Sequence, residues 1–158
     1  MSDAHPPSDP HSPDPLSLAR QLLHDVERAT LGTLSAEGWP YGSLVLIAGD
    51  AAGRPILLLS DLAMHTRNLK ADTRVSLLID GTGDFDDPLT GPRVTVLGRV
   101  AETDDPIARQ AFLDRHPAAT LYAGFADFRV YRIDPTEAHL VAGFGRIHRL
   151  DGSDLITP

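Results

Sequence analysis

From Thr30 onward, the sequence consists of short apolar segments separated by residues that favour turns. The separators include Ala36-Glu37-Gly38 and Asp50-Ala51-Ala52-Gly53, which are typical of hairpin connections. Only 62–71 and 104–115 interrupt the strands with a helical pattern. This order predicts a mainly β meander of antiparallel strands, closed or nearly closed into a β-barrel with flanking helices. The expected strands are 30–35, 40–48, 55–60, 73–80, 92–102, 127–134 and 137–142.

The two ends of the chain differ from this strand-rich middle. Residues 1–15 contain five prolines and, after the first methionine, no large apolar residue, so they are predicted to form a disordered tail. Apolar residues then recur at helical spacing from about Leu16 to Ala29. We therefore expect one folded domain over 16–150 and a short C-terminal tail over 151–158.

Composition excludes several classes of protein. The net charge is −8, whereas binding to nucleic acid or to an anionic membrane needs a cationic surface. There is neither an apolar run of membrane-spanning length nor a secretion signal, so a cytoplasmic location is expected. The chain has no cysteine, which excludes disulfides and thiolate catalysis. No metal site is predicted, because the acidic residues of 84–87 lack the ligand spacing of a calcium loop.

The segment around residue 65 is a candidate anion site. An apolar strand there gives way to a short helix that opens with His65-Thr66-Arg67. Unpaired backbone N–H groups and the positive end of the helix dipole both favour an anion at such a position. The alternative is an ordinary capped helix with solvated charges.

Four segments together resemble a known family. The runs PYGSLVLI, ILLLSDLAMHTRNL, DTRVSLLI and PRVTVLGRV are similar to the FMN-binding split-barrel family related to pyridoxamine 5'-phosphate oxidase. The resemblance is closest to its haem-utilisation (HugZ-like) branch, whose members carry segments comparable to LLLSDLAMHTRNL and HLVAGFGR, and it extends from Leu16 to Leu150. It implies a six-stranded antiparallel split barrel. It also implies a homodimer, with two FMN molecules in grooves between the subunits.

The resemblance also implies a set of cofactor-binding residues. The phosphate would bind at the start of the helix, and the ring would lie against a strand and its apolar side chains. The chain departs from the oxidases at Ser43 and Ala48, where they have arginine and lysine, so two cationic contacts are missing. The residues implied to bind the cofactor are Ser43, Leu44, Leu46, Leu59, Ser60, His65, Thr66, Arg67 and Arg93.

A second segment corresponds to the substrate-binding end of the oxidases. In HLVAGFGRIHRL, Arg146 and His148 occupy the positions of an arginine and a histidine that hold the substrate phosphate. Leu140 replaces the family's tryptophan and Leu150 its final arginine, so we expect inefficient oxidation of pyridoxamine 5'-phosphate. The alternative is a C-terminal arm that only packs against the barrel.

Three classes of function remain open. The leading prediction is an FMN-binding oxidoreductase-like protein that acts on an unidentified small molecule, with no catalytic residue that can be named. A deazaflavin in place of FMN is a variant of this prediction. The second is a haem-binding or haem-degrading protein, with His65, His139 or His148 as the axial ligand of the iron. The third is a cofactor-free interaction module.

Overall fold

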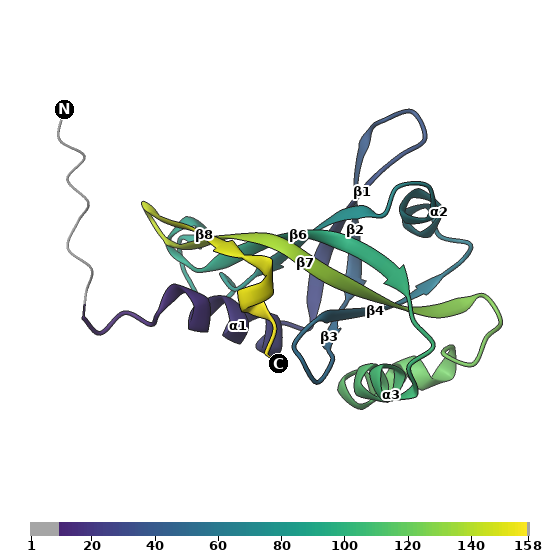
Figure 1. Cartoon of the computed structure of the whole chain (residues 1–158). Helices are drawn as coiled ribbons and strands as arrows, with labels where there is room; N and C mark the ends of the chain where they lie inside the picture. Colours follow the sequence, from purple (N-terminus) through teal and green to yellow (C-terminus); the bar gives the residue numbers. More distant parts are fainter. Residues whose placement is uncertain (1–9, 158) are drawn as a thin grey trace.

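The strands lie in one sheet, and every pair of neighbouring strands runs antiparallel (Figure 1). The computed structural model describes residues 10–157, and none of its helices is long and apolar enough to cross a membrane. The strands of the described chain are β1 (Arg28–Leu34), β2 (Pro40–Leu46), β3 (Ala48–Gly49), β4 (Pro55–Ser60), β5 (Arg74–Asp80), β6 (Arg93–Glu102), β7 (Phe128–Gly143) and β8 (Arg146–Asp151). The helices are α1 (Pro15–Asp25), α2 (Met64–Ala71), α3 (Pro106–Arg115) and the short 3₁₀ turns η1 (Pro88–Thr90), η2 (Pro117–Leu121) and η3 (Gly152–Leu155).

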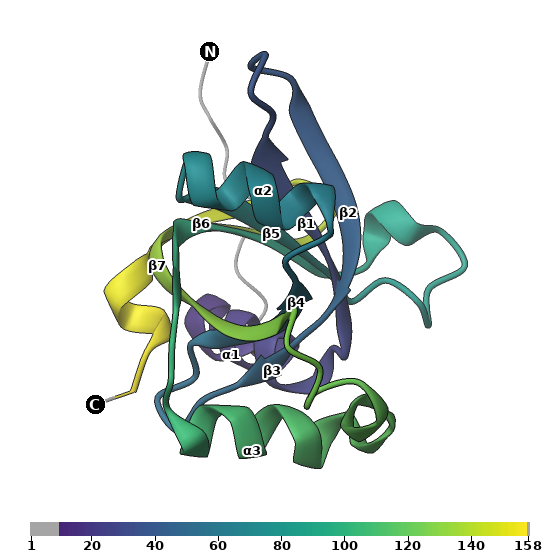
Figure 2. The same ribbon diagram turned by 90° about the vertical axis from the view of Figure 1, so that its right-hand side faces the viewer.

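The sheet closes on itself through one continuous stretch of chain. Its strand order is β2-β1-β5-β6-β7-β4-β3, with β8 paired to β7. The first and last strands of this order, β2 and β3, are separated in sequence only by Ile47. The two edges of the sheet are therefore joined covalently, and the sheet curls into the barrel seen end-on in Figure 2. This confirms the predicted β-barrel with flanking helices.

Three details of the expected architecture are wrong. The family pattern implies six strands, whereas the described chain has eight, because β2 and β3 are separate and β8 adds a strand. The expected strands 127–134 and 137–142 form the single long strand β7. The sheet is also no simple meander, because β4 pairs with β7 rather than with β5.

Alternation of side chains divides the sheet into an inner and an outer face. Inward residues such as Leu31, Leu77 and Val96 are fully buried and form the main core. Strand β4 is apolar on both faces. Leu57 points into the barrel, while Ile56 belongs to a second cluster beneath α3. This double burial explains the uninterrupted apolar run of β4.

The helices cover the barrel and begin at side-chain caps in two of three cases. Asp14 accepts from the backbone N–H of Ser17 at 3.2 Å at the start of α1, and Asp105 accepts from that of Ile107 at 2.9 Å at the start of α3. Helix α1 ends at Asp25, before the predicted end, because Ala29 already lies buried in β1. The two helices predicted within 62–71 and 104–115 are confirmed as α2 and α3.

The C-terminal segment of the described chain contacts the barrel. Leu155 in η3 is 2% exposed and packs in the main core, so packing continues beyond the domain end expected at 150. Of the tail expected over 1–15, residues 1–9 lie outside the described residues.

We expect Leu155→Ala to lower the free energy of unfolding by about 2–4 kcal/mol, because it leaves a cavity in the core. Leu121→Ala is the matched control, since Leu121 is 80% exposed, and its effect should stay within about 0.5 kcal/mol. Urea unfolding followed by circular dichroism measures both. Equal, small effects would show that the C-terminal segment does not contribute to the core.

Candidate functional site

The barrel is open between β2 and β4, which share no backbone pairing. A pocket of about 240 Å³ occupies this opening, and we call it the split pocket. Its walls are mostly aliphatic and aromatic and come from β2, β4, α3 and the segment before β7, with the residues before and within the first turn of α2 at one side. The lining residues are Leu44, Val45, Leu46, Leu58, Leu59, Ser60, Ala63, His65, Phe112, Tyr122 and Phe128.

Strand alternation on β2 produces the apolar wall of the split pocket. Leu44 and Leu46 point outward, and they are 73% and 41% exposed although both are large aliphatic residues. On the opposite wall, Ser60 ends β4 and donates from Oγ to Asp127 Oδ2 at 2.6 Å. The serine hydroxyl is therefore already engaged, and the other polar side chains of the lining are those of His65 and Tyr122.

His65 lies in the first turn of α2 and is the histidine that lines the split pocket. Burial lowers the pKa of His65 below its ordinary value of 6.5, so the imidazole is neutral at neutral pH. Within residues 10–157 its ring forms neither a hydrogen bond nor an ion pair. A neutral imidazole without a partner can accept a proton, donate a hydrogen bond or bind a metal.

The start of α2 is also free to bind an anion. Its cap residue, Ala63, provides no side-chain acceptor for the first backbone N–H groups. Arg67 follows in the same helix, is exposed, and has no ion-pair partner in the described chain. A positive helix end with a free guanidinium nearby favours a carboxylate or phosphate.

The structure brings together five of the nine residues that the family resemblance implies for the cofactor. Leu44, Leu46, Leu59, Ser60 and His65 all line the split pocket.

Two others point away from it. The side chain of Thr66 is completely buried against the barrel, and its Oγ1 has no partner in the described chain. Ser43 is aligned with buried Leu31 on the inner face of the sheet, and its hydroxyl donates to the Leu31 carbonyl at 3.5 Å.

Arg67 lies on α2 but does not line the split pocket, and Arg93 and the two predicted substrate-binding residues lie on other strands. Arg93 Nη1, at the start of β6, donates to the carbonyls of Leu89 and Gly91. Arg146 donates to Ser12 Oγ at 3.1 Å and to the Ala142 carbonyl at 3.2 Å.

His148 on β8 pairs with Leu140 of β7. Within one chain, neither Arg93, Arg146 nor His148 lines the split pocket.

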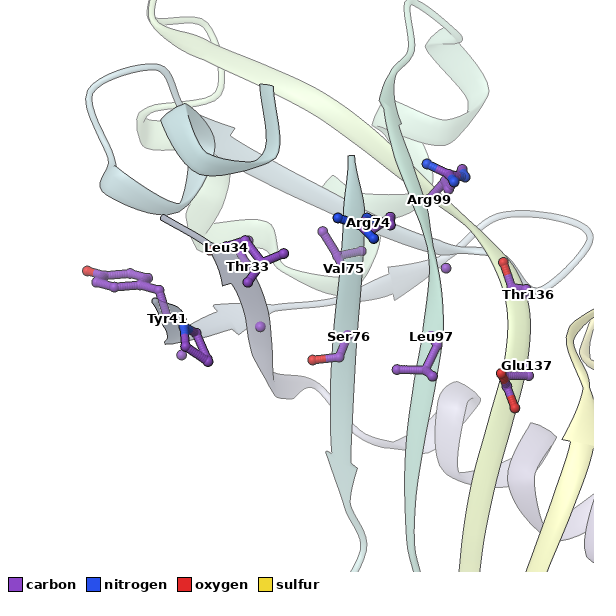
Figure 3. Close-up of a pocket in the computed structure, with 14 residues that line it drawn as sticks. Thr33, Leu34, Tyr41, Arg74, Val75, Ser76, Leu97, Arg99, Thr136 and Glu137 are labelled. Atoms are coloured by element: carbon purple, nitrogen blue, oxygen red, sulfur yellow. The ribbon is translucent and has the colours of Figure 1, made fainter. Parts of the chain in front are cut away.

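A second hollow lies on the outer face of β1, β2, β5 and β6, and sequence reasoning did not identify it. This outer groove has a volume of about 640 Å³ and is shown in Figure 3. Gly42, Gly32, Ser76, Leu97 and Glu137 form one cross-strand row along it. The isolated glycines at two strand positions were the available signal, because glycine within a strand marks a shallow floor or a close approach.

Charge is divided between the two sides of the outer groove. Arg74 and Arg99 lie at one end, and Glu137 lies towards the other (Figure 3). Glu137 accepts from Arg149 Nε at 2.7 Å and pairs with His139 Nε2 at 3.0 Å. The hydrogen bonds from His139 and Arg149 lower the pKa of Glu137, so its carboxylate is ionised at neutral pH and forms an ion pair with Arg149.

Comparison with protein families places these features in a wider group. Residues 10–156 match the model described as the CREG β-barrel. The haem oxygenase HOZ of Arabidopsis thaliana chloroplasts is 40% identical over 134 residues, which cover 82% of this chain and 40% of that protein. The haem oxygenase HutZ of Vibrio cholerae is 27% identical over 139 residues, covering 82% of this chain and 78% of that protein.

A solved structure agrees with this grouping. The haem-binding protein from Mycobacterium smegmatis superposes with a TM-score of 0.85 at 34% identity. The match covers 91% of this chain and 60% of that one. The chain thus spans less than two thirds of the length of HOZ and of the mycobacterial protein.

Proposed function

The chain belongs to the CREG β-barrel family, and on this premise we propose that it binds haem in the split pocket and supports oxidative degradation of that haem. The two curated relatives described above are named as haem oxygenases, and the mycobacterial relative as a haem-binding protein. When bound, haem supplies the redox chemistry, and the protein supplies binding and orientation.

One observation carries the proposal: the split pocket combines apolar walls with a free neutral imidazole and an uncapped helix start. Haem has a flat apolar ring, an iron atom and two carboxylates. Leu44 and Leu46 would contact the ring, and Arg67 would attract a carboxylate. The residues present therefore fit the chemistry of haem.

FMN, the leading expectation from the family resemblance, fits the same pocket less well. Its phosphate would need several donors at the start of α2, yet the hydroxyl of Thr66 is buried on the barrel side. Ser43, expected beside the flavin ring, turns to the inner face of β2. These losses favour the alternative ligand, haem, and FMN becomes the competitor in the binding test.

Haem binding is tested by absorption titration of the purified protein. We expect a Soret band that saturates at one haem per chain, and at most weak binding of FMN. Leu44→Glu should weaken haem binding at least tenfold, about 1.4 kcal/mol, because it removes apolar contact and adds a repelling carboxylate. Leu121→Glu, equally exposed but outside the pocket, should bind as the wild type does. Saturable FMN binding without a Soret band would refute the proposal.

Degradation is tested separately from binding. Haem-loaded protein in air with ascorbate as reductant should lose its Soret band, and catalase should not prevent the loss. Leu44→Glu should slow the loss at limiting haem, because less haem is bound. A Soret band that stays constant for hours under these conditions would leave binding intact and contradict degradation.

The size of the split pocket leads to a proposal about assembly. Its volume of about 240 Å³ is below the range of roughly 300–1,000 Å³ usual for ligand pockets. We propose that a second copy of the chain completes the site by packing against the outer face of the sheet. That face exposes Leu44 on β2, Leu78 on β5 and Leu97 on β6.

Charge on the outer groove is compatible with the same arrangement. Arg74 and Arg99 lie at one end and Glu137 towards the other. Arg74 is paired with Asp72 and Glu137 with Arg149 within one chain, so a two-fold contact of this face would not bury an unpaired charge at either of these two residues.

Sedimentation at micromolar concentration should therefore give about twice 17.0 kDa. Leu97→Asp should shift the species towards monomer, because it sets carboxylates against each other in the apolar contact. The control Leu121→Asp should remain dimeric. A monomeric wild type, or a dimer unaffected by Leu97→Asp, would exclude this interface.

A further inference from the structure

We propose that residues 103–127, between β6 and β7, form a lid that lifts from the barrel to open the split pocket. The segment leaves the sheet at the end of β6, runs through α3 and η2, and returns at the start of β7 (Figure 1). It contributes Phe112 and Tyr122 to the lining of the split pocket. The pocket of about 240 Å³ is small for a ligand, and a movable wall would admit a larger one. Such a lid would control access whichever ligand enters, so it goes beyond the proposed binding of haem.

Both ends of the lid are attached close together, near the start of β7. At its first residue, directly after the end of β6, the Thr103 N–H donates to the Val130 carbonyl at 2.9 Å. At its last residue, the Asp127 carbonyl accepts from the Asp61 N–H at 2.7 Å. Because the entering and leaving chains lie near each other, the segment between them can move as a flap while the strand pairs of the barrel stay intact.

The lid packs on the barrel through the smaller of the two apolar clusters. Its side chains there are between 1% and 4% exposed and contact residues of β3, β4 and β7; they are Ala108, Phe112, Ala119 and Ala123. Within the described chain, the main core contains no residue of 103–127. Alanine methyl groups bury little apolar surface, whereas leucine, isoleucine and valine dominate the main core. Lifting the lid should therefore cost much less free energy than unfolding the barrel.

His116, which follows the end of α3, is the latch of this lid. It is 8% exposed, and its Nε2–H donates to the Ile47 carbonyl at 2.7 Å. A carbonyl can only accept, so Nε2 carries the proton. The neighbouring Arg115 donates to the Asp25 carbonyl at 2.8 Å, but that hydrogen bond is exposed to water. His116 therefore supplies the buried polar attachment in the middle of the lid.

The latch is coupled directly to the split pocket. The imidazole of His116 packs on the ring of Phe112 with centroids 4.9 Å apart, and Phe112 lines the pocket. Its acceptor, Ile47, is the residue that joins β2 to β3. One hydrogen bond thus holds an aromatic wall of the pocket against the strand crossing that creates the opening.

Single cysteines test the lid, because the chain has none of its own. Ala108→Cys and Ala123→Cys place a thiol beneath the lid, and the matched control Ala138→Cys places one in the main core, where it is similarly buried. Without denaturant, the thiol reagent DTNB should label both lid positions about tenfold faster than the control, or more. Urea unfolding of each variant corrects these rates for differences in global stability. Equal rates at all three sites would overturn the proposal, and so would fast labelling at Ala123→Cys alone, which would indicate fraying of η2.

Loss of the latch should affect the lid more than the whole fold. His116→Phe keeps an aromatic ring against Phe112 but removes the donor to the Ile47 carbonyl. Combined with Ala108→Cys, it should raise the labelling rate about fivefold or more, with little change when it is combined with Ala138→Cys. A residue that only stabilises the fold would raise both rates by the same factor, and that result would exclude His116 as the latch.

Access to the pocket is measured by stopped-flow mixing of the full chain with haem, and this readout rests on the proposed function. His116→Phe should raise the association rate constant for haem about threefold or more, because a larger fraction of the protein is open. Faster labelling with an unchanged rate constant would show that the lid does not control the pocket. If the wild type binds no haem, the proposed function fails, and cysteine labelling still decides whether the lid lifts.

Discussion

The passage of the chain from β2 to β3 through Ile47 is the constraint on which the rest of the structure depends. Ile47 is 1% exposed, its N–H donates to the Glu27 carbonyl at 2.9 Å, and its own carbonyl contacts His116 at 2.7 Å. The segment before Ile47 pairs with β1, and the segment after it pairs with β4. One stretch of chain therefore closes the barrel at one end and leaves β2 and β4 apart at the other. The split pocket is a direct result of this crossing.

Much of the strand pattern could be predicted from the sequence, because short apolar segments bounded by turn residues usually form β-strands. Strand β7 is the exception, because Asp134-Pro135 is typical of the end of a strand and predicted two strands in place of one. The register between β6 and β7 shifts at Gly98, which pairs with Pro135, and this bulge lets the strand continue across a residue that has no N–H. A Cβ on Gly98 would overlap the Asp134 carbonyl, so this close approach of β6 and β7 requires glycine.

The end of α1 was predicted too late for another reason. Val26 and Ala29 fit the apolar spacing of a helix, yet the helix ends at Asp25 and the chain continues into β1.

The candidate site could be predicted only in part. The run His65-Thr66-Arg67 after an apolar strand signals an anion-binding helix start, and the structure does leave that start uncapped. Successive helical residues point in directions about 100° apart, so one of three neighbours had to face the barrel, and that residue is Thr66. Which residue turns inward depends on how α2 sits on β1 and β2, and no local pattern contains this information. The outer groove was missed because glycine and serine in a strand give no chemical signal until the neighbouring strands are in register.

The position of the iron tests the central claim most directly. Crystals of the haem-loaded protein, measured at the iron absorption edge, locate the metal by anomalous scattering without any assumption about the cofactor's orientation. If haem binds as proposed, one iron peak per chain should lie in the split pocket between β2 and β4. An iron peak in the outer groove, or beside the Glu137–His139 pair, would contradict it.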